Sequence, residues 1–213
     1  MDSLDRIAQI RILPVVTIHD VADSDPLAEA LCAGGLPVVE VTLRTTLAFK
    51  AIRRMAANQS ILVGAGTVLR AEQVDQAVEA GARFIISPGL SQSVVRRARE
   101  LDVPVVPGVA TPTEVMEALD LGLTTVKFFP AEVLGGVKAM ASIAAPFGQL
   151  RFIPTGGIEG RHLPAYLAEP SVLAVGGSWI ASSSLIRARD YLEITRNARW
   201  VVAAANQSRQ ELT

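Results

Sequence analysis

The sequence predicts an α/β protein built as a (β/α)8, or TIM, barrel. Eight short apolar runs rich in β-branched residues alternate along the chain with stretches of helical periodicity. Near-continuous apolar strands joined by helices indicate parallel strands that are buried on both faces. We find no linker, low-complexity segment or charge run, so residues 1–213 are predicted to form one barrel domain.

The predicted elements follow one another in strand–helix order. The strands cover residues 12–18, 38–43, 61–68, 84–88, 103–109, 125–130, 151–158 and 172–180. Helical patterns between them cover residues 26–33, 48–57, 71–80, 91–101 and 113–121. Gly34, Gly81 and Gly122 follow three of these patterns, as glycine commonly does at a helix C-terminus. An open doubly wound sheet would need a glycine-rich turn after the first strand, and residues 18–21 do not supply one.

Composition and charge exclude several classes of partner. Hydrophobic residues make up 50% of the chain, charged residues 19%, and the net charge is −1, so no nucleic acid and no anionic membrane is expected to bind. The N-terminal segment carries Asp2 and Asp5 where a signal peptide needs basic residues. The uncharged stretch 170–186 contains proline and glycine, so we expect no membrane span and a cytoplasmic protein. Cys32, the single cysteine, is expected to be a small buried apolar residue.

One of the three lysines, Lys127, stands in the middle of the sixth predicted strand. Burial disfavours the charged form of an amine and leaves a neutral fraction, which is a nucleophile. A neutral lysine can attack a carbonyl and form a Schiff base, so Lys127 points to covalent carbonyl chemistry. The structural alternative is a lysine at a strand end that reaches water along its apolar stem.

The second predicted strand places three polar side chains on one face. Glu40, Thr42 and Arg44 alternate with apolar residues at a spacing of two. Glu40 and Arg44 could simply pair with each other. If Lys127 faces the same interior, however, the Glu40 carboxylate can transfer the protons that imine chemistry requires, and Arg44 can hold a substrate carboxylate.

Glycine-rich turns close the seventh and eighth predicted strands. Gly156 and Gly157 follow Thr155, which we expect to contact substrate, and a second glycine pair precedes Ser178. Barrel enzymes often bind phosphate at these two strands through backbone N–H groups.

The third predicted strand carries Gly64 and Gly66 and ends near Thr67. The Thr67 hydroxyl can donate to a substrate carboxylate. The two glycines either let a ligand approach the backbone or allow close packing.

Metal and serine-nucleophile chemistry are not predicted. His19 and His162 lie in different units, and neither belongs to a spacing that binds zinc. No Gly-x-Ser-x-Gly elbow is present. We therefore expect no metal and no cofactor.

Six motifs resemble those of the 2-keto-3-deoxy-6-phosphogluconate (KDPG) aldolases, also described as 4-hydroxy-2-oxoglutarate (KHG) aldolases. They cover residues 39–45, 63–68, 86–90, 127–132, 154–158 and 176–179. The family is a class I, metal-independent lyase on a (β/α)8 barrel, usually a homotrimer. The resemblance implies cleavage of KDPG to pyruvate and glyceraldehyde 3-phosphate, and also of KHG to pyruvate and glyoxylate.

The resemblance also implies roles for individual residues. Lys127 matches the Schiff-base lysine and Glu40 the acid/base. The positions that hold the pyruvyl carboxylate match Arg44 and Thr67, and those of the phosphate site match Gly156, Gly157 and Ser178. Thr42 and Arg44 favour the gluconate branch over a sister group that cleaves the galactonate-derived epimer.

Two other functions stay open from the residues alone. A phosphate-ligand sensor without catalytic activity, or an isomerase that uses Glu40 as its only base, would each leave Lys127 without a task.

Overall fold

Strands and helices alternate along residues 2–211, which the computed structural model describes. The strands are β1 (Ile12–Val16), β2 (Val38–Thr42), β3 (Leu62–Gly66), β4 (Ile85–Ile86), β5 (Val105–Val106), β6 (Gly108–Val109), β7 (Thr125–Phe128), β8 (Arg151–Phe152) and β9 (Val175–Gly177). The helices are α1 (Ser3–Ile10), α2 (Ser24–Ala33), α3 (Ala48–Ala56), α4 (Ala71–Glu79), α5 (Gln92–Glu100), α6 (Pro112–Asp120), α7 (Gly136–Ala144), α8 (Leu163–Leu167), α9 (Ser183–Ala188) and α10 (Tyr191–Glu211), with 3₁₀ turns at Val21–Asp23 and Gly160–His162.

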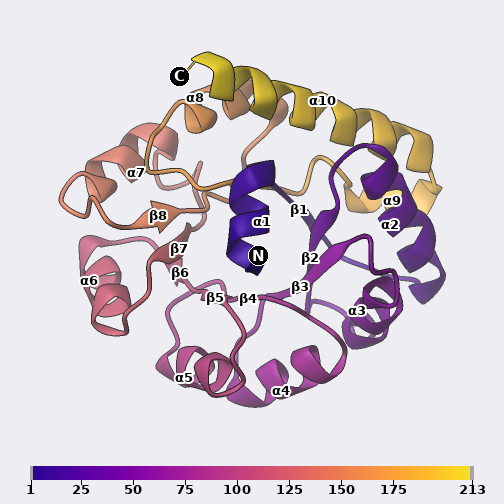
Figure 1. The fold of residues 1–213 in the computed structure, drawn as a ribbon, viewed down its shortest axis with the longest axis horizontal. Coiled ribbons are helices and arrows are strands. Elements are labelled where there is room, and N and C mark those ends of the chain that lie inside the picture. The colour runs from indigo at the N-terminus through magenta and orange to yellow at the C-terminus, as the bar shows by residue number, and fades with distance from the viewer. Residues whose placement is uncertain (1, 212–213) are drawn as a thin grey trace.

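The strands pair in parallel, in two groups. Six of them form a sheet in the order β5-β4-β3-β2-β1-β9, and β6-β7-β8 form a second sheet. Isolated parallel bridges join Phe152 to Val172 and Thr155 to Gly176, between the chain around β8 and the chain around β9. Figure 1 shows the helices other than α1 as an outer ring around the strands. The fold is therefore α/β with a curved parallel sheet, and the predicted alternation of parallel strands and helices is confirmed.

Every predicted strand coincides with an observed one, but the observed strands are shorter. The predicted strand 103–109 is divided into β5 and β6 at Pro107, which has no N–H to donate to a neighbouring strand. The predicted strand 151–158 keeps strand geometry only over Arg151–Phe152. Gly156 and Gly157 have φ of +104° and +76°, which strand residues do not adopt, so the chain turns there.

The five predicted helices are confirmed with small shifts at their ends. Helix α6 begins at Pro112, one residue before the predicted start, because Thr111 accepts from the backbone N–H of Glu114 and the Glu114 side chain returns the bond. Gly81 and Gly122 follow α4 and α6, as predicted, and both have positive φ. Gly34 instead ends α2 in a right-handed conformation.

No bounds were predicted for the remaining helices, although eight strand–helix units require helices where α7 and α8 are found. Helix α1 lies across the centre of the ring in Figure 1, and its Ser3 hydroxyl donates to the Arg83 carbonyl. Helix α10 runs along the outside, against α2, α8 and α9. Within residues 2–211, no helix is long and apolar enough to cross a membrane.

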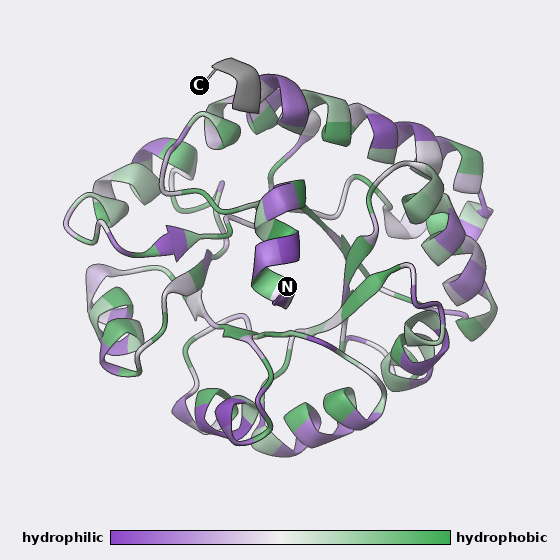
Figure 2. Cartoon of the chain, viewed as in Figure 1, coloured by the Kyte–Doolittle hydropathy of each residue, from purple (hydrophilic) through white to green (hydrophobic). Residues whose placement is uncertain are grey.

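Hydrophobic faces of the surrounding helices turn toward the strands, whereas hydrophilic residues lie on their outer faces (Figure 2). The strands are buried on both faces, as the burial of every residue of β2, β3 and β7 illustrates. Few polar side chains are buried among the described residues. Four of them line a single pocket: Glu40, Thr42, Lys127 and Thr155.

Candidate active site

Lys127 and Glu40 form a buried ion pair. The lysine Nζ lies 3.2 Å from Oε1 and 3.4 Å from Oε2 of Glu40. The Lys127 side chain is 7% exposed and that of Glu40 is 1% exposed. Lys127 therefore does not extend to bulk water, and the alternative of a strand-end lysine in solvent is wrong.

Strand geometry explains why Lys127 points inward. Alternation along β7 places Thr125, Lys127 and the following Phe129 on one face. The Nζ atom lies 5.3 Å from the centre of the Phe129 ring, within the range of a cation–π contact. The Lys127 backbone is paired with Gly108 of β6, so both neighbours of the strand fix its position.

Glycines of β3 provide the space that Glu40 occupies. Thr42 of β2 is opposite Gly66 in the parallel register, and a side chain at Gly66 would overlap the Glu40 carboxylate. A side chain at Gly64 would overlap the Phe84 ring. Of the two roles considered for these glycines, packing is the one that the structure supports.

Thr67, directly after β3, has a φ of +59° and lines the pocket. For a β-branched residue this left-handed conformation is a true outlier and costs about 1–3 kcal/mol. Such strain concentrates at functional sites, because surrounding contacts must hold the residue in place. The Thr67 hydroxyl is thereby fixed at the pocket wall.

Arg44 does not pair with Glu40, so the structural alternative for these two residues is wrong. Among the described side chains, Arg44 has no hydrogen-bond or ion-pair partner, and it is exposed at the pocket edge. It also lines an adjoining hollow of about 190 Å³, together with Val15 and Ser178. A guanidinium without a protein partner is available to an anionic ligand.

The two glycine turns lie side by side at the pocket. Gly156 is next to the Phe129 ring, where a Cβ would lie 3.1 Å from the ring carbons. Gly176 leaves room for the Thr155 hydroxyl. Ser178 follows β9 and is exposed.

One pocket of about 140 Å³ joins these elements at the carboxyl ends of the strands. All eight predicted site residues line it: Glu40, Arg44, Thr67, Lys127, Thr155, Gly156, Gly157 and Ser178. Sequence reasoning missed its apolar walls, which are Val15, Pro88, Phe129 and Ile158. Of these, Phe129 was detectable, because it shares the inward face of β7 with Lys127.

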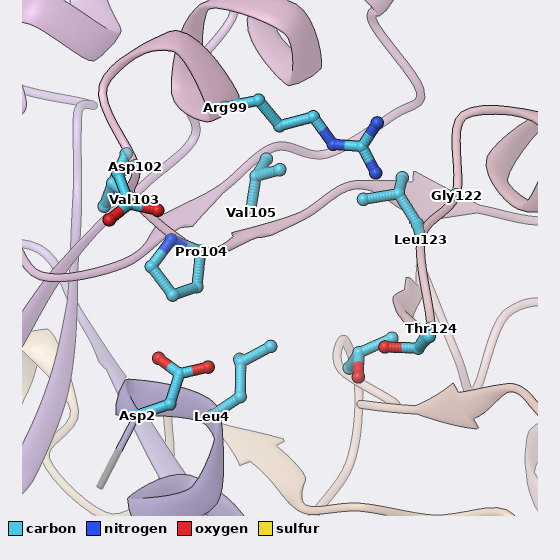
Figure 3. A pocket seen from close by; sticks show the side chains of 11 residues that line it. Asp2, Leu4, Arg99, Asp102, Val103, Pro104, Val105, Gly122, Leu123 and Thr124 are labelled. Carbon is cyan, nitrogen blue, oxygen red and sulfur yellow. The ribbon is translucent and has the colours of Figure 1, made fainter.

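A larger hollow of about 460 Å³ lies at the opposite, amino ends of β5 and β7. Figure 3 shows its walls, with the Arg99 guanidinium near Gly122 and the carboxylates of Asp2 and Asp102 on other sides. It shares no lining residue with the Lys127 pocket. In barrel-like α/β enzymes chemistry occurs at the carboxyl ends of strands, so size does not make this hollow the active site.

The two histidines and the single cysteine lie outside the Lys127 pocket. Among the side chains that the structure describes, no three of His, Cys, Asp or Glu are grouped so that they could hold a metal ion. Cys32 is partly rather than fully buried. Desolvation raises the pKa of its thiol, and the nearby Arg6 charge opposes that shift without cancelling it, so the thiol form is favoured.

The fold and the pocket at the carboxyl ends of its strands belong to a chain whose relatives are aldolases, which are lyases of carbon–carbon bonds. The chain belongs to the KDPG and KHG aldolase family, whose sequence model matches residues 4–197.

Comparisons with individual proteins agree. The chain is 47% identical over 195 residues to a KHG/KDPG aldolase of Escherichia coli, covering 91% of this chain and 92% of that protein. It resembles the structure of the 2-keto-3-deoxy-6-phosphogluconate aldolase of Zymomonas mobilis with 3-phosphoglycerate, with TM-score 0.89, 46% identity and coverage of 94% and 95% of the two chains. A KDPG aldolase of Legionella pneumophila, with pyruvate captured as a covalent carbinolamine, gives TM-score 0.90, 40% identity and coverage of 94% and 98%.

Proposed function

We propose that the protein is a class I aldolase that cleaves KDPG to pyruvate and glyceraldehyde 3-phosphate, and also KHG to pyruvate and glyoxylate. The observation that carries this proposal is the Lys127 amine 3.2 Å from Glu40 inside the pocket. The covalent carbinolamine of pyruvate in the Legionella relative supports it, because that species is the first adduct of an amine with a 2-keto acid.

Imine formation begins when Lys127 Nζ attacks the C2 carbonyl carbon of the substrate. Glu40 accepts the proton that the ammonium must lose before this attack. It then returns a proton to the carbinolamine oxygen, which leaves as water. The product is a protonated imine between Nζ and C2.

Carbon–carbon cleavage follows because the protonated imine can accept the electron pair of the C3–C4 bond. Glu40 removes the proton of the C4 hydroxyl, the C3–C4 bond breaks, and its electron pair forms the enamine while the aldehyde departs. Protonation of the enamine at C3 by Glu40 gives the pyruvyl imine. Water then hydrolyses it and releases pyruvate from Lys127.

Binding contacts are assigned to the remaining pocket residues. Arg44 and Thr67 hold the pyruvyl carboxylate, and Thr155 contacts the substrate beside them. Gly156, Gly157 and Ser178 bind the phosphate through backbone N–H groups and one hydroxyl. Their positions along the pocket support these roles, as does the 3-phosphoglycerate in the Zymomonas structure.

We also propose that the two sheets belong to one closed (β/α)8 barrel domain, with β5 and β6 acting as a single strand divided at Pro107. The two bridges between the β8 and β9 segments support closure on one side. The homotrimer and the cytoplasmic location stay predictions. Light scattering after size-exclusion chromatography tests the trimer.

Reductive trapping tests the function. Incubation with pyruvate and borohydride should convert the imine to a stable secondary amine, and peptide mapping should find the adduct on Lys127 alone among the three lysines. A sensor or an isomerase that uses Glu40 alone predicts no adduct. Absence of both trapping and KDPG cleavage would overturn the proposal.

A further inference from the structure

Glu132 connects the end of the Lys127 strand to the glycine turn of the pocket. Its backbone N–H donates to the Gly156 carbonyl at 3.0 Å, and the N–H of Ala131 donates to the Thr155 carbonyl at 2.8 Å. Two consecutive backbone bonds therefore fix the turn to the segment that follows Lys127. Neither Glu132 nor Ala131 lines the pocket.

The side chain of Glu132 also contacts the turn. A Cβ placed on Gly157 would lie 2.9 Å from Glu132 Cβ and 3.3 Å from its Cγ. Gly157 has φ of +76°, a conformation that other residues adopt only with strain. The Glu132 stem thus packs against the glycine whose backbone is assigned to the phosphate.

Tyr166 of α8 holds the Glu132 carboxylate. Its hydroxyl donates to Oε1 at 2.6 Å, and the tyrosine is 1% exposed. Burial raises the pKa of this phenol, and the hydrogen bond to Glu132 adds to the shift. The hydroxyl therefore remains a proton donor throughout the neutral range.

His162 Nδ1 lies 3.7 Å from the other carboxylate oxygen of Glu132, which is too far for a hydrogen bond. Within hydrogen-bond distance, Nδ1 of His162 has the Glu159 backbone N–H at 3.1 Å as its partner instead. Among the described side chains, the Tyr166 hydroxyl is consequently the one hydrogen-bond donor to Glu132.

We propose that Glu132, held by Tyr166, is a positioning residue that sets the Gly156–Gly157 turn for the phosphate and so determines the preference for phosphorylated over unphosphorylated keto acids. This inference rests on the proposed function. Loss of the Tyr166 hydroxyl removes the side-chain support of the turn, which the two backbone bonds then hold alone, and it releases a carboxylate beside the turn, where negative charge repels phosphate. Both effects act on the distal part of the substrate and leave the reacting carbon unaffected.

Steady-state kinetics on KDPG and KHG test the proposal with four variants of the full chain. Tyr166→Phe removes the donor, Glu132→Ala removes the stem and the acceptor, and Glu132→Gln keeps an acceptor oxygen of the same size. Tyr191→Phe is the matched control, because the Tyr191 hydroxyl donates to Asp23 at 2.8 Å and neither residue lines the pocket. Pyruvate trapping by borohydride measures imine formation separately in each.

We expect Tyr166→Phe and Glu132→Ala to raise KM for KDPG about tenfold, the scale expected for a lost hydrogen bond to a charged group. In these two variants, KM for KHG and the extent of pyruvate trapping should stay within about twofold of the parent. Glu132→Gln should keep KM for KDPG near that of the parent, because its amide oxygen still accepts from Tyr166.

A Tyr166→Phe variant with unchanged KM for KDPG, or with equal losses on both substrates, overturns the inference. Failure of the parent protein to trap pyruvate or cleave KDPG would instead overturn the proposed function, so the two results are distinct.

Discussion

Lys127 and Glu40 meet from two different sheets, with Nζ 3.2 Å from Oε1 although 87 residues separate them in the chain. Both side chains are buried, and an isolated buried charge is costly, so each charge depends on the other. The pair also contains the two groups that imine chemistry needs, an amine and a proton acceptor. Variants of either residue therefore change both the chemistry and the balance of charge in the interior.

Lys127→Arg should abolish KDPG cleavage and pyruvate trapping. Arginine keeps the positive charge opposite Glu40 but does not lose its proton, so it provides no nucleophile. Lys138→Arg, an exposed change on α7, is the control and should keep both activities. Turnover by Lys127→Arg above a few percent of the parent, with a normal denaturation midpoint, would exclude Lys127 as the nucleophile.

Glu40→Gln should lower kcat by about 10² to 10⁴, the usual contribution of a positioned acid or base. The amine remains in place, so pyruvate should still be trapped, but more slowly. Glu72→Gln, on the exposed surface of α4, is the control and should match the parent. If Glu40→Gln turned over at the normal rate, Glu40 would be only a structural partner of Lys127.

Gly157→Ala should reduce kcat/KM for KDPG far more than for KHG. A Cβ there meets Glu132 at 2.9 Å, and an alanine at φ of +76° costs about 1–2 kcal/mol, so the turn must shift. The remote phosphate contact matters only for the phosphorylated substrate. Gly148→Ala is the control, because a Cβ at Gly148 meets no atom within 4 Å. Equal losses on both substrates would place the phosphate elsewhere.

Stability should fall as the pH rises from about 10 toward 12. Burial and the hydrogen bond to Asp23 raise the pKa of Tyr191 to about 12, and the pKa of Tyr166 is also raised. The native state keeps protons that the unfolded chain loses in this window, so the stabilisation is complete below the unfolded pKa and lost above the folded one.

Urea unfolding at several pH values, with tyrosinate absorbance, measures this dependence. Tyr191→Phe should show a shallower decline than the parent. An identical decline in the two proteins would assign the alkaline loss of stability to other groups.

Local sequence was enough to predict the strand and helix order, because each predicted strand is a buried apolar run with clear flanking turns. It was insufficient for the bounds of α1 and of α7 to α10, and for the strand ends. Helix α10 buries Ile194, Ala198, Val201 and Ala205, which recur at helical spacing, but two of these four residues are alanines and the apolar signal is weak. Strand β3 ends directly before Thr67, a β-branched residue whose positive φ no local pattern predicts, and β8 ends at Phe152, well before the glycines that close the predicted strand.

The sequence by itself determined the chemistry available at the site. A lysine inside an apolar strand, a carboxylate on an inward strand face and two glycine turns were visible as residue types at a spacing of two or at strand ends. Strand periodicity is local, so it fixes which side chains point inward without any knowledge of the partner strands.

The tertiary structure alone decided how these residues are paired. From the sequence, Glu40 had Arg44 on its own strand as an equally reasonable partner, yet the curved sheet turns it toward Lys127 and leaves Arg44 at the pocket edge. The Glu132–Tyr166 contact, 34 residues apart, was likewise undetectable in the sequence. Such pairings depend on sheet curvature and on the space left by Gly66, which arise only when distant segments pack together.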